Sequence, residues 1–240
     1  MRSSNADADI GEGALSNVRA ALFDVDGTLT SGGSVWRPLL RSPDVSPAKK
    51  AWLYATAMPH YLLSKGRMAS QAGFRDRWVR LMAWLMAGWS VEAVEEICQE
   101  VASTQLAPNL RLDVVDILKQ HQQHGHYVVL VSTMFEGIVQ ELARLLGADV
   151  GLGSRVAVQD GRCLGRVEDM TCSGERKVQF VREHLAQRPE RISLAECAAY
   201  ADSRADFPLL ASVGYPVAVY PDSAMRAYAE KRGWRVFGGM

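Results

Sequence analysis

The chain has 240 residues, of which 48% are hydrophobic, so it can bury one large core with an insertion or two smaller cores. Its 27 basic and 27 acidic residues balance, which leaves no charge excess to favour nucleic acid or an acidic membrane surface. The four cysteines have neither C-x-x-C nor zinc spacing and indicate buried thiols of a reducing compartment. No apolar run approaches the ~18 residues that span a bilayer. We therefore expect a cytoplasmic protein without a membrane span.

The chain begins with a polar, acidic segment, residues 1–17, which lacks the apolar core of a signal peptide and is expected to be a loose tail. Residues 19–23 then form a short apolar run that ends at Asp24. A short run without a polar face is typical of a strand that is buried on both faces of a parallel sheet. We therefore place the first strand of the core here.

The next segment, residues 34–105, interrupts the pattern of strands. Apolar residues recur every three or four positions over residues 74–89 and again over 91–101, which is the spacing of one helical face. We expect an all-helical cap here, and we refer to residues 34–105 as the insertion. The insertion also has tryptophans and methionines that lie off this apolar helical face. Part of its surface is therefore expected to contact the core, a partner subunit in a homodimer, a ligand or a lipid surface.

The remaining elements alternate between helix and strand. Helices are expected at 108–124, 136–146, 174–187 and 223–232, strands at 127–131, 197–201, 216–220 and 234–237, and a hairpin at 156–158 and 163–167 around Asp160-Gly161. This alternation predicts an α/β fold, Rossmann-like and doubly wound, with a mainly parallel sheet formed by residues 18–33 and 106–240. The first of these helices ends among His121, His124 and His126, which we expect to be solvated and not to bind a metal.

The strongest chemical signal follows the first predicted strand, in the sequence Asp24-Val-Asp26-Gly27-Thr28. Ligands of open parallel sheets bind outside the carboxyl ends of the strands. Around a phosphate ester, one carboxylate can attack phosphorus while the other protonates the leaving oxygen, and Gly27 permits the chain reversal that aims both. A plain Asp-Gly turn with a capping threonine is the alternative interpretation.

Three weaker signals follow in chain order. Ser132 comes after the second predicted strand and can bind a phosphate oxygen, although by itself a helix cap is the better explanation. Lys177 lies in the first turn of a predicted helix and can neutralise a phosphoryl group, whereas an isolated helical lysine is usually solvated. Asp202 and Asp206 follow the third predicted strand, where carboxylate oxygens suit Mg²⁺ and an aspartate helix cap is the alternative. Four signals in the order expected of one site favour a single phosphate- and magnesium-binding centre.

In these motifs the chain resembles the haloacid dehalogenase-like superfamily, in its phosphoserine-phosphatase-like group with a helical cap. The four motifs of that superfamily are matched in chain order by Asp24-x-Asp26-Gly27-Thr28, Ser132, Lys177 and Asp202-Ser203-x-x-Asp206. The resemblance covers residues 19–237. It departs at Ala201, where a glycine is usual, and at Thr133, where a smaller residue is more typical, and neither departure removes a reactive group.

The resemblance implies a Mg²⁺-dependent phosphatase, a phosphoric monoester hydrolase that works through an aspartyl-phosphate. Asp24 would be the nucleophile, and Asp26 would protonate the leaving oxygen and then deprotonate the hydrolytic water. The other implied roles are phosphate binding by Ser132, Lys177 and Thr28, metal binding by Asp24, the backbone carbonyl of Asp26 and Asp202, and support by Asp206, Gly27 and Ser203.

We expect the substrate to be a small or partly apolar phosphate ester. The alternatives are a phosphotransferase with the same intermediate and an inactive binding protein of the same fold. Related phosphatases that accept an ammonium place an acid soon after the first motif, but residues 28–43 contain no Asp or Glu. A buried ammonium without a counter-charge is costly, so free phosphoserine is not expected to be the best substrate.

Overall fold

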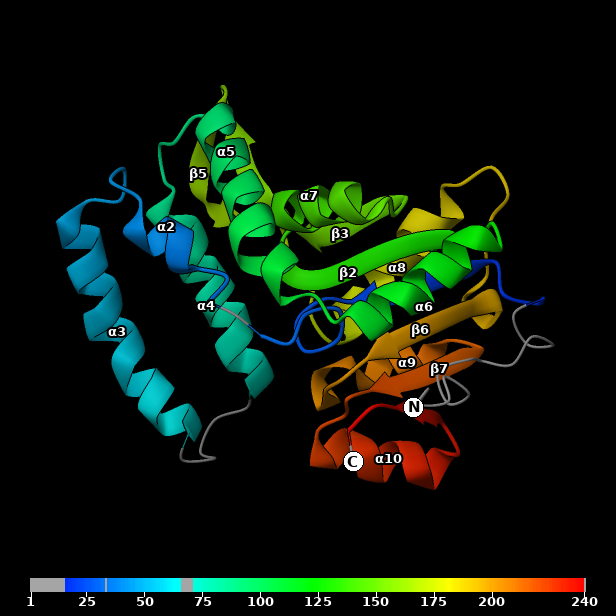
Figure 1. Cartoon of the computed structure of the whole chain (residues 1–240). Helices are drawn as coiled ribbons and strands as arrows, with labels where there is room; N and C mark the ends of the chain where they lie inside the picture. Colours follow the sequence, from blue (N-terminus) through cyan, green and yellow to red (C-terminus); the bar gives the residue numbers. More distant parts are fainter. Residues whose placement is uncertain (1–15, 33, 66–70, 240) are drawn as a thin grey trace.

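The computed structural model of the chain describes residues 16–32, 34–65 and 71–239 (Figure 1). The predicted tail, residues 1–17, lies outside this part of the chain except for Ser16 and Asn17. The first side chain of the apolar stripe expected over 74–89 also lies outside the described residues.

Six parallel strands form one sheet in the order β3-β2-β1-β6-β7-β8. They are β1 Ala20–Asp24, β2 Tyr127–Phe135, β3 Val150–Ser154, β6 Cys197–Ala201, β7 Tyr215–Val219 and β8 Arg235–Phe237. Every residue of β1 and β6 is buried, as expected of central strands without a solvent face. The chain runs outward from β1 to β3 and resumes on the other side of β1 at β6, so these two strands flank the point where the order reverses. An open α/β sheet binds its ligands at the carboxyl ends of such strands.

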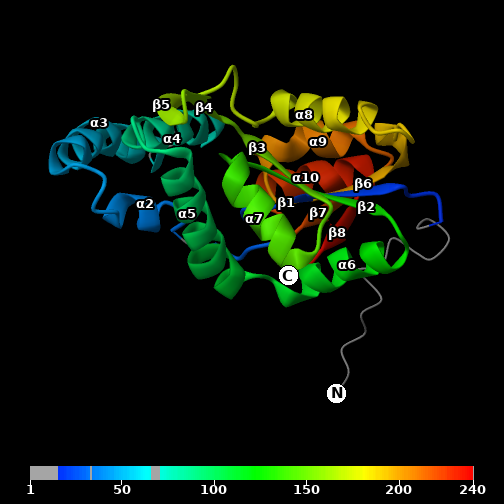
Figure 2. The same ribbon diagram turned by 90° about the horizontal axis from the view of Figure 1, so that it is seen from above.

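Helices cover both faces of this sheet (Figure 2). The helices α6 (Leu112–Gln123) and α7 (Glu136–Leu146) pack on one face, and α8 (Glu175–Ala186), α9 (Phe207–Ser212) and α10 (Ser223–Arg232) pack on the other. Side chains alternate between the faces: Phe23 and Tyr200 stack with their ring centres 4.5 Å apart on the first face, whereas Leu22 and Ala199 belong to the second. The predicted α/β, Rossmann-like fold is confirmed.

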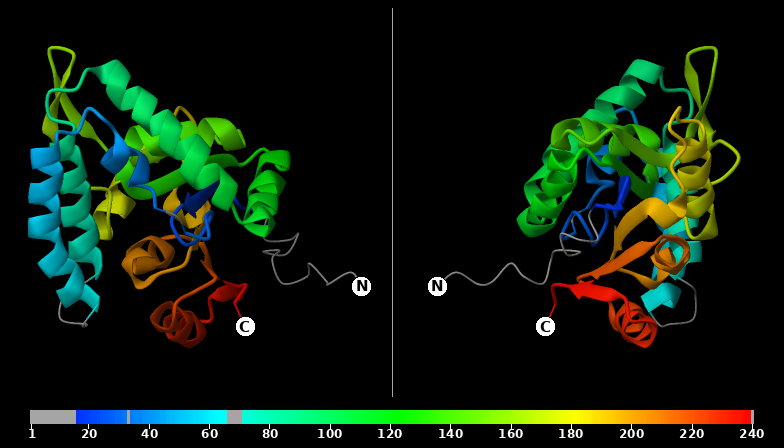
Figure 3. Two further views of the ribbon diagram at one scale, coloured as in Figure 1. Left: turned by 60° about the vertical axis from the view of Figure 1, so that its left-hand side comes forward. Right: turned by 90° about the vertical axis from the view of Figure 1, so that its right-hand side faces the viewer.

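The described residues of the insertion form helices and turns and contribute no strand to the sheet. The helices are α2 Arg37–Arg41, α3 Pro47–Lys65, α4 Gln71–Leu85 and α5 Val91–Val101, and a π-helical turn from Ala102 to Leu106 follows α5. Figures 1 and 3 show α3 and α4 side by side as an arm beside the core, while α5 packs against α7. The exposed apolar residues Trp52 and Tyr54 lie on α3, each with half of its surface accessible.

A β-hairpin connects the core to the insertion. The strands β4 (Val156–Gln159) and β5 (Arg162–Val167) flank Asp160 and Gly161, whose φ angles of 50° and 73° suit the predicted tight turn. The amide of Gly88 donates to the carbonyl of Cys163, and the amide of Cys163 donates to the carbonyl of Trp89, both at 2.8 Å. The hairpin therefore holds the α4–α5 junction by backbone hydrogen bonds.

Strands β2 and β3 differ from the prediction. β2 continues past Val131 to Phe135, but its pairing with β1 ends at Val131 and its register with β3 shifts beyond that residue, so Ser132 begins an irregular stretch. β3 was not predicted, because the glycines of Gly-Leu-Gly are atypical of a strand. They are required by packing: a Cβ at Gly151 would lie 2.4 Å from the backbone of Val139 in α7. The short helix α9 was also not predicted.

The prediction of solvated histidines is wrong for two of the three. His121 and His126 are buried, and their Nδ1 atoms lie 2.7 Å apart. Nε2 of His121 lies 2.7 Å from the hydroxyl of Tyr200 in β6. Burial, with the neighbouring His126 and His124, lowers the pKa of His121 to about 3, so its ring is a neutral hydrogen-bonding group of the core. The four cysteines are buried and unpaired, as predicted. Among the described residues, no helix has the length and apolar character needed to cross a membrane.

Candidate active site

Asp24 is the last residue of β1, and its carboxylate is buried at the carboxyl end of the sheet. The hydroxyl of Thr28 donates to Oδ2 at 3.1 Å, and the ammonium of Lys177 donates to Oδ1 at 2.7 Å. Burial raises the pKa of Asp24 to about 6, although the charge of Lys177 opposes this shift. The carboxylate is therefore held ionised near neutral pH by a lysine that lies 153 positions away in the sequence.

Lys177 lies in the first turn of α8 and is only 2% exposed, which excludes the alternative of a solvated lysine. Its ammonium also donates to Oδ1 of Asp206 at 2.5 Å, and the hydroxyl of Ser203 donates to Oδ2 of Asp206 at 3.0 Å. Burial lowers the pKa of Lys177, but the charges of Asp206 and Asp24 outweigh it and hold the pKa above its ordinary value. Lys177 thus joins two carboxylates that would otherwise repel each other.

Asp202 follows β6 directly, as predicted, and carries the carboxylate that has least support. Its Oδ1 is buried and has no hydrogen-bond partner among the described residues. Burial, followed by the charges of Asp24 and Asp206, raises its pKa to about 8. Carboxylate oxygens of these three aspartates lie within 4.8 Å of one another. An orphaned buried carboxylate oxygen beside two others fits a divalent cation that prefers oxygen ligands, such as Mg²⁺.

Gly27 allows Asp202 to approach the first motif. Its φ angle of +88° lies in the left-handed region, where glycine carries no steric penalty. A Cβ at this position would lie 2.1 Å from Oδ2 of Asp202. The glycine is therefore required by close approach as well as by the turn.

Asp26 and Ser132 complete the group of predicted residues that the structure brings together. Asp26 is half-buried, and burial raises the pKa of its carboxyl while the charge of Arg75 opposes the shift. Ser132 is buried on β2, and its Oγ accepts a hydrogen bond of 3.2 Å from the amide of Met134. Both residues line one cavity together with Asp24. A carboxylate, a second acid and a hydroxyl thus face the same space at the carboxyl ends of β1 and β2.

Comparison with known proteins agrees with this geometry. The model of the haloacid dehalogenase-like hydrolases matches residues 21–211. A probable phosphatase of Mycobacterium tuberculosis is 33% identical over 220 residues, which cover 90% of this chain and 74% of the relative. A phosphoserine phosphatase of the same organism is 31% identical over 225 residues, covering 90% and 70%. A solved Bordetella pertussis protein of unknown function is 27% identical with a TM-score of 0.76, and the match covers 92% of this chain and 98% of that one.

The chain belongs to the haloacid dehalogenase-like hydrolase family. The resemblance inferred from the motifs is confirmed, and so is the prediction of a phosphatase at the level of family and reaction class. The fold of solved phosphoserine phosphatases is shared as well, with a TM-score of 0.58 at 19% identity for one of them.

The cavity of this hydrolase contains residues that the sequence analysis missed. It has a volume of about 240 Å³ and lies between the core and the insertion. Its lining consists of Asp24, Asp26, Ser132, Thr133 and Met134 from the core and Trp36, Arg75, Trp78 and Val79 from the insertion. Arg75 was not predicted, yet a signal was available: it precedes Trp78 by three residues on α4, so the two share a helical face.

A polar contact fixes α4 against the core of the hydrolase. The hydroxyl of Thr171 donates to the carboxylate of Asp76, the residue after Arg75. Thr171 is buried in the loop before α8, which carries Lys177. This contact joins the insertion to the loop before α8, at the carboxyl end of the sheet.

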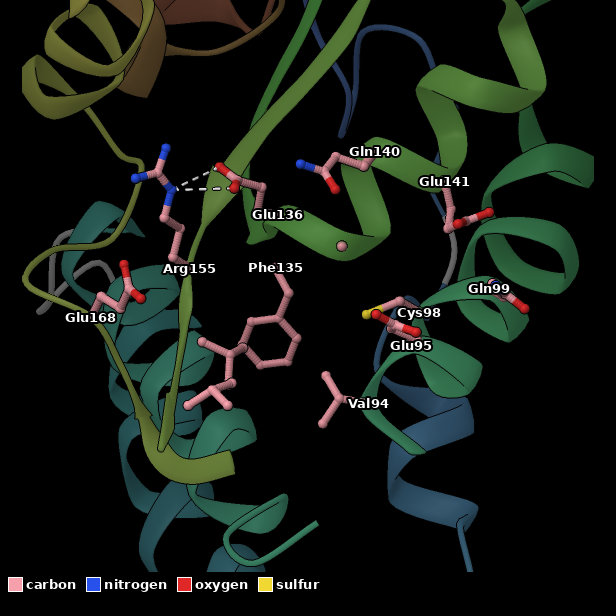
Figure 4. Close-up of a pocket in the computed structure, with 13 residues that line it drawn as sticks. Val94, Glu95, Cys98, Gln99, Phe135, Glu136, Gln140, Glu141, Arg155 and Glu168 are labelled. Atoms are coloured by element: carbon pink, nitrogen blue, oxygen red, sulfur yellow. Dashed lines mark hydrogen bonds and ion pairs between the residues drawn. The ribbon is translucent and has the colours of Figure 1, made fainter. Parts of the chain in front are cut away.

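A second, more open cavity of about 530 Å³ lies between α5, α7 and the hairpin (Figure 4). Glu95, Glu136, Glu141 and Glu168 line it, and Arg155 contacts Glu136 there. None of the motif residues lines this cavity, so we do not assign it to phosphate chemistry.

Proposed function

We propose that the protein is a Mg²⁺-dependent phosphomonoesterase in which Asp24 is the nucleophile. The observation that carries this proposal is the buried contact of Asp24 with Lys177, at 2.7 Å, inside a cluster of three carboxylates at the carboxyl end of the sheet. An ionised oxygen of Asp24 attacks phosphorus, the bond from phosphorus to the ester oxygen breaks, and an aspartyl-phosphate forms. Water then hydrolyses this intermediate, which releases phosphate and restores Asp24.

Asp26 is proposed as the general acid and base. Its carboxyl lines the same cavity as Asp24, and its raised pKa favours the protonated form that the leaving oxygen requires. After giving up this proton, the carboxylate accepts one from the attacking water. Asp26 is thus regenerated in each cycle.

The residues proposed to hold Mg²⁺ are Asp24, Asp202 and the backbone carbonyl of Asp26. When bound, the ion would neutralise charge on the phosphoryl group and favour in-line attack. We propose that Ser132, Lys177 and Thr28 bind or orient the phosphoryl oxygens. Thr28 and Lys177 contact the carboxylate of Asp24, and Ser132 lines the same cavity as Asp24. Asp206, Gly27 and Ser203 would support them through the contacts described above.

We further propose that residues 18–33 and 106–240 form the catalytic core and that the insertion, residues 34–105, is its cap. The partly apolar lining that Trp36, Trp78 and Val79 give to the cavity supports a small or partly apolar phosphate ester as substrate. Four unpaired thiols support a cytoplasmic location. A homodimer through the apolar insertion stays a prediction.

The test is turnover of an aryl phosphate by Asp24→Asn, with Mg²⁺ and with EDTA. The substitution preserves shape but cannot attack phosphorus, so we expect loss of turnover with an unchanged circular dichroism spectrum. Wild-type enzyme should be silenced by EDTA and restored by Mg²⁺. Measuring alcohol and phosphate release with added glycerol separates hydrolysis from phosphoryl transfer. More than trace activity in pure Asp24→Asn protein would remove Asp24 from the nucleophile role.

A further inference from the structure

The part of the cavity contributed by the insertion is flat and apolar. Trp36 and Trp78 line it together with Val79, and Met134 adds an apolar side chain from β2. The indole of Trp36 is held in place by an edge-on contact with Phe135, with ring centres 5.0 Å apart. Indole rings bind planar groups by stacking, which contributes ~0.5–1.5 kcal/mol beyond the area that is buried.

Arg75 adds one positive charge to this lining. It lies on α4 one turn before Trp78, and its charge reaches Asp26 and Asp202 in the core. Lys177 is already held by Asp24 and Asp206, whereas no carboxylate of the described residues forms an ion pair with Arg75. The half-buried position of Arg75 at the cavity wall suits a guanidinium that receives an anionic group from a ligand.

Acidic groups are lacking on the same wall. Among the described residues that line the cavity, the only carboxylates are Asp24 and Asp26, which the proposed chemistry uses. An ammonium on the leaving group would therefore be repelled by Arg75 and would have no carboxylate of its own. The cavity volume of about 240 Å³ is below the 300–1,000 Å³ of typical ligand pockets and suits a small leaving group.

We infer that the substrate is a phosphomonoester whose leaving group has a small, flat apolar body and a second anionic group, with Trp36 and Trp78 contacting the body and Arg75 the anion. This inference rests on the proposed function. It narrows the substrate from partly apolar esters in general to planar ones, and it makes Arg75 the residue that decides the preferred charge of the leaving group.

The flat body is tested with benzyl phosphate and cyclohexylmethyl phosphate, which have similar size and comparable alkoxide leaving groups. We expect kcat/KM to be about 2- to 12-fold higher for benzyl phosphate, the range that corresponds to ~0.5–1.5 kcal/mol of stacking. Trp78→Leu should remove this preference, whereas Trp78→Phe should retain part of it. Equal efficiencies of wild-type enzyme on the two esters would overturn the assignment of a planar body.

The anionic group is tested with 4-carboxybenzyl, 4-methylbenzyl and 4-(aminomethyl)benzyl phosphates. We expect kcat/KM to fall in that order, with about tenfold or more between the first two, as for a charge-assisted hydrogen bond. Arg75→Met should abolish the preference, so that the 4-carboxybenzyl and 4-methylbenzyl esters have equal kcat/KM in this variant. Arg77→Met is the matched control, because Arg77 is exposed on the same helix and does not line the cavity.

The outcomes separate this inference from the proposed function. If Arg75→Met lowers all three efficiencies by the same factor, Arg75 acts on the phosphoryl group and the inference is wrong, while the phosphatase proposal stands. Three equal efficiencies in the wild-type enzyme would also overturn it. Failure of the proposed function has a different signature, since turnover of every ester would then persist in Asp24→Asn.

Discussion

Replacement of Gly27 by alanine tests the geometry that joins the first motif to Asp202. The added Cβ would lie 2.1 Å from Oδ2 of Asp202, whereas ordinary contacts begin at 3.4 Å, so the carboxylate has to move by more than about 1 Å. Mg²⁺ demands ligands at ~2.0–2.1 Å, and a carboxylate displaced this far no longer reaches the ion. Loss of an outer-shell partner alone costs ~10–100-fold in metal affinity, and we expect at least this loss here.

Gly88→Ala is the matched control. Gly88 has a φ angle of +87°, nearly the same as the +88° of Gly27, but a Cβ there would meet nothing within 4 Å. Both variants should lose ~1–2 kcal/mol of stability from a left-handed alanine. For a chain of this size that loss lowers the melting temperature by roughly 2–8 °C. Only Gly27→Ala should lower the affinity for Mg²⁺.

The assays are Mg²⁺ titrations of aryl phosphate turnover and calorimetric Mg²⁺ binding to both variants. We expect the Mg²⁺ concentration for half-maximal activity to rise at least tenfold for Gly27→Ala and to stay within twofold of wild type for Gly88→Ala. A wild-type Mg²⁺ response of Gly27→Ala would refute the reasoning, because Asp202 would then not be a ligand or would not approach the loop as described.

Three further perturbations address the metal, the buried lysine and the buried histidine. Asp202→Ala should raise the Mg²⁺ requirement in activity titrations, since it deletes one of few protein oxygens available to the ion; an unchanged requirement would contradict its role. Lys177→Met should lose ~3–5 kcal/mol in denaturant unfolding because two carboxylates become unpaired, whereas the exposed Lys119→Met should stay within about 0.5 kcal/mol. The pKa of His121 is about 3 when folded and 6.5 in the unfolded chain, so protons bind preferentially to the unfolded state as pH falls below 6.5. Stability should thus drop by ~2 kcal/mol between pH 7.5 and 5 through this group, and His121→Gln should show a correspondingly flatter pH dependence of unfolding.

The elements that the sequence predicted well are those whose local pattern has one physical interpretation. Residues 197–201 are small or apolar throughout and form β6 with the predicted bounds, and the helix at 223–232 also has its predicted bounds. The local pattern predicts both β1 and β6, the strands that flank the point where the strand order reverses. It therefore also places Asp24 and Asp202, which come at the ends of these strands, at one edge of the sheet. Parallel pairing of β1 with β6 brings their carboxyl ends together.

Other features depend on approaches between distant segments, which a local pattern does not encode. The burial of Lys177 requires α8 to pack under two carboxylates, and nothing in its own helix marks it as buried. Gly151 is atypical of a strand in the local pattern, and only the close approach of the α7 backbone explains why a glycine is needed there. Arg75 likewise enters the site only because Asp76 and the hairpin hold the insertion over the sheet. The burial of Lys177, the strand at Gly151 and the place of Arg75 in the site were not predicted for a physical reason: each is set by contacts between segments that are distant in the sequence.

The charge balance of the site links the proposed metal binding to the proposed substrate binding. Asp24, Asp202 and Asp206 place three carboxylates within 4.8 Å, and Lys177 supplies one positive charge to them. Asp202 is the carboxyl that is hardest to ionise, because burial and then the charges of Asp24 and Asp206 raise its pKa to about 8. A phosphate ester adds further negative charge to the same space. In the proposed function, a divalent cation bound at Asp202 would reduce the repulsion between these carboxylates and the phosphate ester, so the carboxylate that lacks a hydrogen-bond partner is the one expected to make phosphate binding depend on metal.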